Sequence, residues 1–390
     1  MYHIHYLNPI SPEGTALWRG NYQLTDSLNQ ADAVLVRSAA MHDLPLPEGL
    51  LAVARAGAGV NNIPLEKCAQ QGIVVFNTPG ANARSVMELT LCGLLLASRD
   101  IVGGVNWVRS LRDGQDVSKL VEKEKSRFAG HEIFGKRLGV IGLGAVGGPF
   151  ANAARELGME VYGCDPFISI DAAWRLDSQV RRVNTREEIF ESCDVISLHT
   201  PLLDSTREMI DRETLAKMKD GVVILNFARD ALVNDDDMAQ ALSSGKVSRY
   251  VTDFPNGKTA AMPGCIAIPH LGASTQESED NCAKMAVGQV MNYLENGNIV
   301  HSVNFPDCDM GICTAAARIT VLHGNIPNSL SRFTAAVSSE GINIAGLMNK
   351  SRGKYAYTML DLDHRPSPGV ADALRKIEGV YRVRVLAGDS

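Results

Sequence analysis

The sequence predicts an α/β protein built mainly of parallel strands with helices between them, and three observations lead to this fold class. Short apolar segments alternate with helix-length segments over most of the 390 residues, which is typical of strand–helix–strand units. A glycine-rich turn follows one apolar segment near residue 142 and opens a helix. After residue 315 the order of segments changes, which indicates a separate small domain.

Composition and charge narrow the class of protein. Hydrophobic residues make up 45% and charged residues 21%, and the net charge of −6 with a pI near 5.9 gives no general attraction to nucleic acid or to anionic membranes. The first residues, MYHIHYLNPISPEG, lack the pattern of a targeting signal, and we expect a cytoplasmic protein with no membrane partner. The eight cysteines contain no C-x-x-C pair, so we expect reduced, mostly buried thiols and no metal site.

Residues before 112 predict a first α/β unit with a parallel, flavodoxin-like sheet. Segments 33–38, 51–57 and 73–80 are apolar and end in turn residues, so we expect three strands. One long helix is expected over 85–111, capped by Ser85, and a polar run at 113–127 separates this helix from the middle of the chain.

The middle of the chain predicts a complete doubly wound domain of the Rossmann type. Six strands are expected, at 137–142, 160–165, 194–200, 222–228, 249–254 and 265–270. A second long helix is expected over 274–297, beginning with a capping box of Ser274 and Glu277 and ending at Gly297. Because two long helices bracket it, this domain is expected to be inserted into the first one.

These patterns give a domain organisation. We expect residues 1–91 and 274–302 to form a substrate-binding domain and residues 92–273 to form the dinucleotide-binding domain. A linker is expected at 303–314. Residues 315–390 contain four strand candidates with helical stretches after the first and third, and this βαββαβ order predicts a ferredoxin-like domain.

The glycine turn predicts a dinucleotide site. Gly142, Gly144 and Gly147 have the G-x-G-x-x-G spacing directly after a strand and at the start of a helix, where backbone N–H groups bind phosphate. Asp165 ends the next strand, where a carboxylate bonds ribose hydroxyls and repels a 2′-phosphate. We therefore expect NAD as the cofactor.

Two further strand ends carry groups suited to redox chemistry on a hydroxy acid. Such a reaction needs a group that exchanges a proton near neutral pH and a cation that polarises a carbonyl or holds a carboxylate. His270 and Arg229 follow the last residues of two strands, where open α/β sheets build their sites. By position alone, His270 is equally well explained as a structural histidine.

Four motifs in this order, VIGLGAVG, ISLHTPLLDSTREMI, ILNFARDALV and IPHLGAST, resemble the D-2-hydroxyacid dehydrogenase family. The resemblance implies that Arg229 binds the substrate carboxylate and that His270 is the acid/base. It also implies cofactor contacts, which we assign to Ala145, Val146, Thr200, Pro201, Ala228 and Asp253 together with the glycines and Asp165.

The sequence departs from that family at one place. The family usually has a glutamate that bonds the histidine, a few residues after a strand end like that at Asp253, whereas this chain has Gly257 or Lys258 near the expected position. Three alternatives are open: Asp253 takes the role, the histidine works without a carboxylate, or the enzyme is impaired. A carboxylate would favour the protonated imidazole, so its absence is expected to displace the acid limb of the pH–rate profile downward.

The segments VRSA, RAGAGVNNI and NTPGANARSVMELT resemble the members of the family that act on a phosphorylated 2-hydroxy acid. This resemblance implies phosphate contacts from Arg37 and Ser38, and arginine suits phosphate because its planar fork donates two parallel hydrogen bonds. We expect Gly57, Ala58 and Gly59 to offer backbone N–H groups to the substrate carboxylate, and Asn82 and Arg84 to line the substrate site. For Arg84 a solvated surface charge is an equally good interpretation.

The C-terminal domain resembles an ACT domain, a small unit that binds amino acids. His323, Asn325 and Asn343 match the residues that hold L-serine in serine-sensing members, and His and Asn side chains supply both donors and acceptors. Asn328 stands where a glycine is common, and a capping turn without ligand is the alternative. Apolar helix faces and exposed strands predict a homodimer or homotetramer.

The sequence therefore predicts an NAD-dependent oxidoreductase acting on the CH–OH group of a phosphorylated 2-hydroxy acid, with L-serine as its effector. A reductase of glyoxylate or hydroxypyruvate on the same fold is the first alternative, because it needs neither Arg37 nor the C-terminal domain. An NAD-responsive binding protein with little turnover is the second, and the missing glutamate is its only support.

Overall fold

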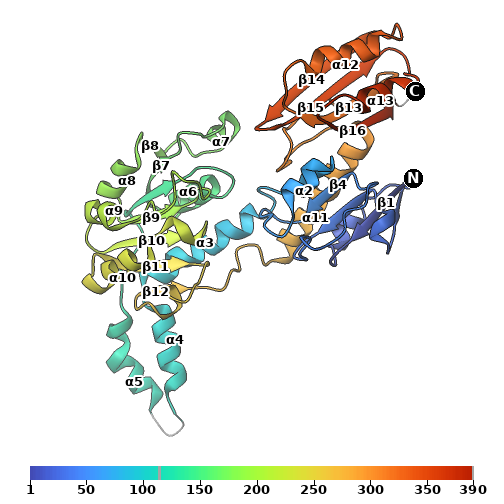
Figure 1. Ribbon diagram of the computed structural model, residues 1–390. Helices are drawn as coiled ribbons and strands as arrows, with labels where there is room; N and C mark the ends of the chain where they lie inside the picture. Colours follow the sequence, from blue (N-terminus) through green and yellow to red (C-terminus); the bar gives the residue numbers. More distant parts are fainter. Residues whose placement is uncertain (113–115, 389–390) are drawn as a thin grey trace. The chain divides into compact units, whose positions relative to one another are not determined.

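The computed structural model describes residues 1–112 and 116–388 of the chain (Figure 1). The chain divides into two compact units, one of residues 1–82 with 276–390 and the other of residues 83–275. Within the described residues, no helix combines the length and the apolar character that a bilayer crossing requires.

The first unit begins with a five-stranded parallel sheet in the order β2-β1-β3-β4-β5, the flavodoxin-like order. Its strands are β1 (Tyr2–Tyr6), β2 (Tyr22–Leu24), β3 (Ala33–Val36), β4 (Ala52–Arg55) and β5 (Val74–Phe76). The first two strands are missing from the sequence prediction. The strand β1 reads YHIHY, in which only Ile4 is buried, and β2 is a half-exposed edge strand, so neither has the apolar run of a buried strand.

The helices of this sheet are α1 (Pro12–Thr15), η1 (Leu28–Gln30), α2 (Leu65–Gln70) and α11 (Gln276–Asn296). The helix α11 begins at Gln276, two residues after Ser274, whose N–H donates to Leu271 O of the preceding turn at 2.9 Å. The C-terminal end is as predicted, because Gly297 adopts φ 73° and ends the helix.

The segment expected as a linker, 303–314, is packed against the first sheet. Asn304 Oδ1 accepts a hydrogen bond from Val75 N and its Nδ2 donates to Ile73 O, both at 2.9 Å. One side chain therefore bonds a backbone N–H and a backbone carbonyl at the edge strand β5. Phe305 and Cys308 are fully buried. This segment therefore closes the sheet edge in addition to connecting α11 to the C-terminal strands.

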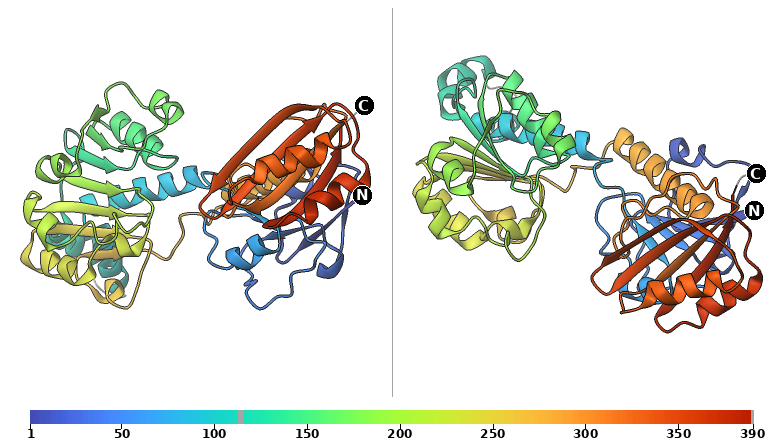
Figure 2. Two further views of the ribbon diagram at one scale, coloured as in Figure 1. Left: turned by 45° about the horizontal axis from the view of Figure 1, so that its top comes forward. Right: turned by 90° about the horizontal axis from the view of Figure 1, so that it is seen from above.

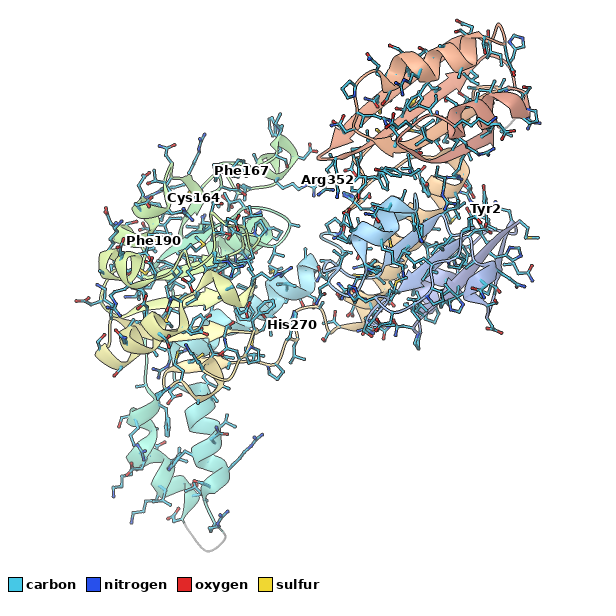
Figure 3. All side chains as sticks on the ribbon, viewed as in Figure 1. Tyr2, Cys164, Phe167, Phe190, His270 and Arg352 are labelled. Atoms are coloured by element: carbon cyan, nitrogen blue, oxygen red, sulfur yellow. The ribbon has the colours of Figure 1, made fainter. Side chains whose placement is uncertain are left out.

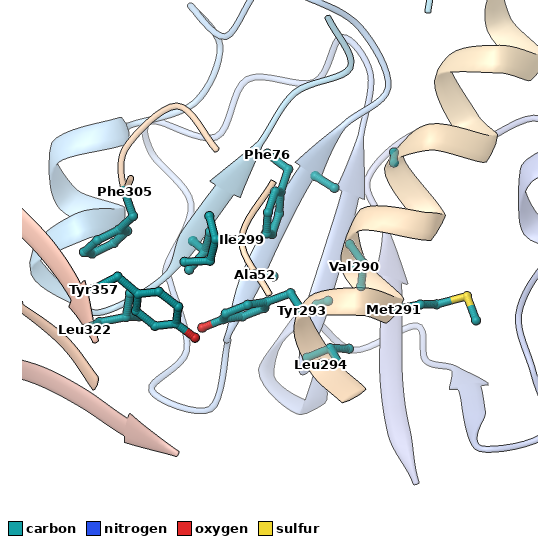
Figure 4. Packing of buried hydrophobic residues seen from close by; sticks show 14 of the residues in the cluster. Ala52, Phe76, Val290, Met291, Tyr293, Leu294, Ile299, Phe305, Leu322 and Tyr357 are labelled. Atoms are coloured by element: carbon teal, nitrogen blue, oxygen red, sulfur yellow. The ribbon is translucent and has the colours of Figure 1, made fainter. Parts of the chain in front are cut away.

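The C-terminal residues form a four-stranded antiparallel sheet in the order β14-β15-β13-β16. The elements are β13 (Ala317–Gly324), α12 (Ser329–Ser338), β14 (Ile344–Arg352), β15 (Tyr355–Leu362), α13 (Pro368–Arg375) and β16 (Val380–Ala387), which confirms the predicted βαββαβ order. Leu322 and Tyr357 share a buried cluster with Phe76, Ile299 and Phe305 (Figure 4). The sheet is therefore part of the core of the first unit.

Arginines of the C-terminal sheet reinforce this packing by donating to backbone carbonyls. Arg384 donates to Tyr293 O and Leu294 O near the end of α11, at 2.9 and 2.6 Å. Arg352, labelled in Figure 3, donates to Ser302 O at 2.7 Å. These bonds give charged partners to backbone carbonyls of buried residues near a helix end and in a connecting loop.

The second unit is a doubly wound parallel sheet in the order β12-β11-β10-β9-β6-β7-β8. Its strands are β6 (Arg137–Ile141), β7 (Glu160–Cys164), β8 (Arg181–Arg182), β9 (Val195–Leu198), β10 (Val222–Asn226), β11 (Val247–Thr252) and β12 (Cys265–Ala267). The six predicted strands are confirmed, and the two-residue edge strand β8 was not predicted because both of its residues are exposed arginines. Helices cover both faces of this sheet (Figure 2), and a separate buried cluster lies on each face.

The helices of the second unit are α3 (Ala83–Ser98), α6 (Gly147–Glu156), α7 (Ile170–Trp174), α8 (Arg186–Ser192), α9 (Arg212–Lys217) and α10 (Asp235–Ser244), with η3 (Asp230–Leu232) and η4 (Thr259–Ala261). A hairpin of α4 (Ile101–Ser110), α5 (Val117–Glu124) and η2 (Lys125–Phe128) comes after α3. In the polar run at 113–127, residues 113–115 lie outside the described part of the chain.

The single long helix expected over 85–111 is wrong, because the chain breaks between α3 and α4. Asp100 caps α4 by accepting from Gly103 N at 3.1 Å, and its own N–H donates to Phe128 O of the hairpin. Ser85 lies inside α3, which begins at Ala83. The cysteines are free and six are buried, as expected, whereas Cys92 is exposed on α3.

Candidate active site

The glycine turn after β6 has the geometry that a dinucleotide requires. Gly142 adopts φ 92°, and a Cβ there would lie 2.6 Å from His199 O, while a Cβ on Gly147 would lie 1.9 Å from Gly142 O. A Cβ on Gly144 would meet no atom within 4 Å. The first and third glycines are therefore required by packing, and the middle one faces open space, as a pyrophosphate-binding position needs.

Asp165, which comes directly after β7, is tied to this turn. Its Oδ2 accepts from Leu143 N at 2.8 Å and its Oδ1 accepts from Phe167 N at 2.9 Å. These bonds fix the carboxylate beside the turn, and Asp165 is only half-buried. The carboxylate of Asp165 beside the turn and the open space at Gly144 together fit NAD.

The remaining predicted cofactor contacts lie around the same end of the sheet. Ala145 and Val146 continue the glycine turn into α6, Thr200 and Pro201 follow β9, and Ala228 follows β10. The strands β6 and β9 are neighbours whose connections run to opposite sides of the sheet, so their carboxyl ends flank its topological switch point. His199 lies there too, with Nε2 at 2.8 Å from Ser197 Oγ, and burial lowers the pKa of His199 to about 4.

Arg229 is held by a turn that a buried side chain organises. The Nδ2 of Asn226 donates to Arg229 O at 2.8 Å and to Tyr250 Oη at 3.3 Å, and its Oδ1 accepts from Ala228 N and Arg229 N at 3.2 and 3.4 Å. The guanidinium is exposed, with Nη1 donating to Ala228 O at 2.6 Å. Asn226 was absent from the prediction, and its position at the end of a strand three residues before Arg229 is the signal that could have revealed it.

His270 follows β12 and is exposed (Figure 3), and its ring lies 4.5 Å from the Phe254 ring between centroids, at an angle of 45°. Arg229 Cζ lies 5.8 Å from the centroid of that same ring. Asp253 is buried: its Oδ2 accepts from Gly272 N at 3.3 Å and its Oδ1 has no hydrogen-bond partner. Burial raises the pKa of Asp253, and the nearby positive charges of His270 and Arg229 oppose this effect.

The segment after Phe254 is held against α10 by two side-chain hydrogen bonds. Asn256 Nδ2 donates to Asp235 Oδ2 at 2.8 Å, and Lys258 Nζ donates to Asp236 Oδ1 at 2.7 Å. Among the described residues, no hydrogen bond or ion pair from a carboxylate to the His270 ring occurs, so Asp253 is a neighbouring charge without direct contact.

In the first unit, Arg37 and Ser38 follow β3 in a loop that Asn8 organises. Asn8 Oδ1 accepts hydrogen bonds from the N–H groups of Arg37, Ser38 and Ala39 at 2.9–3.0 Å. The Arg37 guanidinium forms an ion pair with Glu279 of α11 at 2.5 Å. A phosphate bound there would therefore compete with a carboxylate that this arginine already contacts.

The backbone of Gly57, Ala58 and Gly59 is held by side chains rather than left open. Arg55 donates to Arg37 O at 2.9 Å and to Gly59 O, and Asn77 Nδ2 donates to Ala58 O at 2.6 Å. These bonds occupy carbonyls, and the Gly57 N–H donates to Arg55 O at 2.9 Å, so the N–H groups of Ala58 and Gly59 are left as the donors for an anion. Arg55 and Asn8 are further organising residues that the prediction missed.

Asn82 and Arg84 precede and begin α3, at the boundary between the two units. The Arg84 side chain is 85% exposed and pairs with Glu88 one turn later at 3.2 Å. This is the geometry of a surface ion pair on a helix.

In the C-terminal sheet, His323 is buried, unlike Asn325 and Asn343. Its Nδ1 lies 2.8 Å from Gly324 O and its Nε2 lies 2.9 Å from Thr358 Oγ1, and its ring packs against Phe333. Burial lowers the pKa of His323. Asn328 precedes α12 with φ 64°, a left-handed conformation that asparagine tolerates, and its side chain forms no capping hydrogen bond.

Comparison with known proteins gives one consistent result. The family described as "D-isomer specific 2-hydroxyacid dehydrogenase, NAD binding domain" matches residues 93–272. The D-3-phosphoglycerate dehydrogenase of Haemophilus influenzae is 32% identical over 348 residues, which cover 86% of this chain and 81% of that protein. The hydroxypyruvate reductase of Thermotoga maritima is 34% identical over 71% of this chain and 94% of that protein.

A solved structure agrees with these matches. The NAD+-bound 3-phosphoglycerate dehydrogenase of Entamoeba histolytica has a TM-score of 0.60 at 26% identity, covering 78% of this chain and 98% of that one. The matched region spans just over half the length of two further curated relatives.

Proposed function

This chain belongs to the D-isomer specific 2-hydroxyacid dehydrogenases, NAD-dependent oxidoreductases that act on the CH–OH group of 2-hydroxy acids, and we propose that it oxidises 3-phospho-D-glycerate to 3-phosphohydroxypyruvate. This reaction would be the first step of L-serine biosynthesis. One observation carries the proposal: the Arg229 guanidinium and the His270 imidazole contact the same aromatic ring at the carboxyl edge of the NAD-binding sheet.

Each reacting group has a role that its chemistry supports. Bound NAD would supply the hydride acceptor for C2 of the substrate. Arg229 binds the substrate carboxylate through its planar guanidinium, which orients C2. His270 takes the proton of the C2 hydroxyl as the carbonyl forms. Asp253, with one buried oxygen that has no partner, would receive a donor from the cofactor or lie beside the imidazolium as a counter-charge.

The phosphate group distinguishes this substrate from unphosphorylated acids. We assign its binding to Arg37 and Ser38 and the carboxylate side of the substrate to the turn 57–59, with Asn82 and Arg84 at the margin. Residues 1–91 and 274–302 would then form the substrate-binding domain and residues 92–273 the NAD-binding domain. The resemblance in VRSA and the loop order imposed by Asn8 support this assignment.

A direct assay tests the proposal. Purified chain with 3-phospho-D-glycerate and NAD should produce NADH, detected by its absorbance, and His270→Gln should lower kcat about 100-fold or more. His364→Gln is the matched control, because that histidine is 79% exposed in the C-terminal domain. No NADH from the wild-type protein would refute the proposal.

The hydroxypyruvate reductase of Thermotoga maritima, with 94% of its length matched, favours one alternative. NADH consumption with hydroxypyruvate or glyoxylate, and no reaction with phosphoglycerate, would establish it. An NAD-binding protein with little turnover would bind NADH and react with none of these substrates.

We further propose that residues 315–390 form an ACT domain that binds L-serine through His323, Asn325 and Asn343, joined to the rest of the chain by the segment 303–314. The βαββαβ order supports this. Serine binding requires His323 to give up one of its two internal hydrogen bonds. Millimolar L-serine should inhibit the wild-type protein and leave His323→Ala active; a wild-type rate that serine does not change would refute the proposal.

We also propose a cytoplasmic homodimer or homotetramer. Ile101, Val102, Val105 and Val108 of α4 are each 40–48% exposed, and an apolar helix face of this kind needs a covering partner. Light scattering after size-exclusion chromatography should give a multiple of the 42.0 kDa chain, and Val105→Asp should reduce it. A monomer at micromolar concentration would refute this.

A further inference from the structure

Phe254 is the one described side chain with ring contacts to both reacting groups. We propose that Phe254 is a positioning residue, which sets the orientation of the His270 imidazole and holds the Arg229 guanidinium through the faces and edge of one ring. The inference rests on the proposed function for its effect on catalysis, whereas its geometric part concerns the protein alone.

The two contacts have the geometry of specific aromatic interactions. The ring centroids of Phe254 and His270 are 4.5 Å apart with a 45° tilt, inside the range in which aromatic pairs attract beyond their simple burial. Arg229 Cζ lies 5.8 Å from the Phe254 centroid, within the distance for a cation–π contact. One ring can therefore hold two side chains that come from different strand ends.

The backbone around Phe254 is itself fixed. Its N–H donates to the hydroxyl of the fully buried Thr252 at 3.1 Å, and Pro255 restricts the backbone of the residue before it to extended conformations. The preceding residue, Asp253, is bonded to Gly272 N, which ties the end of β11 to the loop that carries His270. The ring is only half-buried, so its position is determined by the fixed backbone more than by side chains packed around it.

Polar groups do not replace this contact. In the described part of the chain no side chain forms a hydrogen bond with the His270 ring, and the buried Asp253 interacts with it only through its charge. The polar side chains of Asn256 and Lys258, which follow Phe254 in the sequence, form their hydrogen bonds with Asp235 and Asp236 of α10. The orientation of the imidazole therefore depends on Phe254.

The first experiment measures orientation without any substrate. The chain has nine histidines, and NMR spectra of protein with isotope-labelled histidine show the ring resonances of all of them. The resonances that disappear in His270→Gln belong to His270. Because an aromatic ring shifts the resonances of protons near its face or edge, Phe254→Leu should move the His270 ring signals toward those of an exposed histidine. Phe254→Tyr should leave them near their wild-type positions.

The second experiment measures the consequence for catalysis. Phe254→Leu should lower kcat/KM for 3-phospho-D-glycerate about tenfold, the order expected from the loss of one aromatic pair contact. The Kd for NADH and the thermal midpoint should stay at the wild-type values, which separates positioning from a general structural role. Phe254→Tyr, which retains the ring, should restore most of the activity.

The outcomes are distinguishable. Unchanged His270 resonances in Phe254→Leu would overturn the inference, and so would an activity loss as large in Phe254→Tyr as in Phe254→Leu. A wild-type protein that does not oxidise phosphoglycerate but shows the predicted change in the His270 resonances would refute the proposed function and support the orientation by Phe254.

Discussion

Removing the Asn226 side chain should disorder the turn that carries Arg229, and we expect Asn226→Ala to lose both stability and activity. The side chain is fully buried and makes four hydrogen bonds, three of them to the backbone of residues 228 and 229. At about 1 kcal/mol each, with the weakest two counted at half, their loss lowers the free energy of unfolding by about 3 kcal/mol.

The activity should fall further than the stability alone implies. Arg229 is exposed, so without Asn226 its backbone has no buried side chain to hold it in place. A displacement of about 1 Å in a group that positions substrate can cost about 100-fold in rate. We therefore expect kcat/KM for 3-phospho-D-glycerate to fall about 100-fold, mostly through KM, since Arg229 is proposed to bind the substrate carboxylate.

Urea unfolding followed by circular dichroism and steady-state NADH formation measure the two effects. Tyr250→Phe is the matched control, because it removes the 3.3 Å bond from Asn226 and the contact of the Tyr250 hydroxyl with Thr252 but leaves the three bonds to residues 228 and 229. It should cost about 1 kcal/mol with little change in KM. If Asn226→Ala were less stable but kept kcat/KM within twofold of wild type, the claim that Asn226 positions Arg229 would be refuted.

Three further predictions concern the same unit. Gly147→Ala should weaken NADH binding about tenfold or more in calorimetry, because its Cβ would lie 1.9 Å from Gly142 O and the turn must shift. Gly257→Glu returns a carboxylate near the position where the family has a glutamate, and a carboxylate that reaches the His270 ring favours the protonated imidazole, so the acid limb of log kcat/KM should move to higher pH; Gly257 is exposed and its Cβ would meet no atom within 4 Å. His199, with its pKa lowered to about 4 from 6.5, binds more protons when unfolded, so its contribution to stability is present above pH 6.5 and decreases by about 2 kcal/mol by pH 5 in urea unfolding.

Each of these has a control. Gly144→Ala, the control for Gly147→Ala, adds the same methyl group where it meets no atom, so the stability of the protein should not change. Equal NADH affinity in the wild type and Gly147→Ala would contradict the packing argument. Gly257→Gln introduces a side chain of the same size without the charge and should leave the acid limb in place. His199→Gln should show less loss of stability between pH 7 and 5, and an unchanged pH dependence would show that His199 is not responsible.

The local sequence determined most elements of this protein because their signals are short in range. Consecutive residues alone predict the apolar strands β3 to β7 and β9 to β12, the turn at Gly142 and the order of the C-terminal elements. In each case the hydrophobic period, the positions of glycines and the length of the apolar run can be recognised in the local sequence. Arg229 and His270 were predicted as site residues from their positions at strand ends and from the family motifs around them.

Contacts between distant residues were decided only by the tertiary structure. The strand β8 consists of two exposed arginines and exists because β7 offers it an edge, and Asn304 closes β5 from more than two hundred residues away. The contact between Phe254 and His270 likewise depends on where two loops meet. A residue's own neighbours in sequence carry no information about such partners, because the free energy that selects them comes from burial and hydrogen bonding that arise only when the chain is folded.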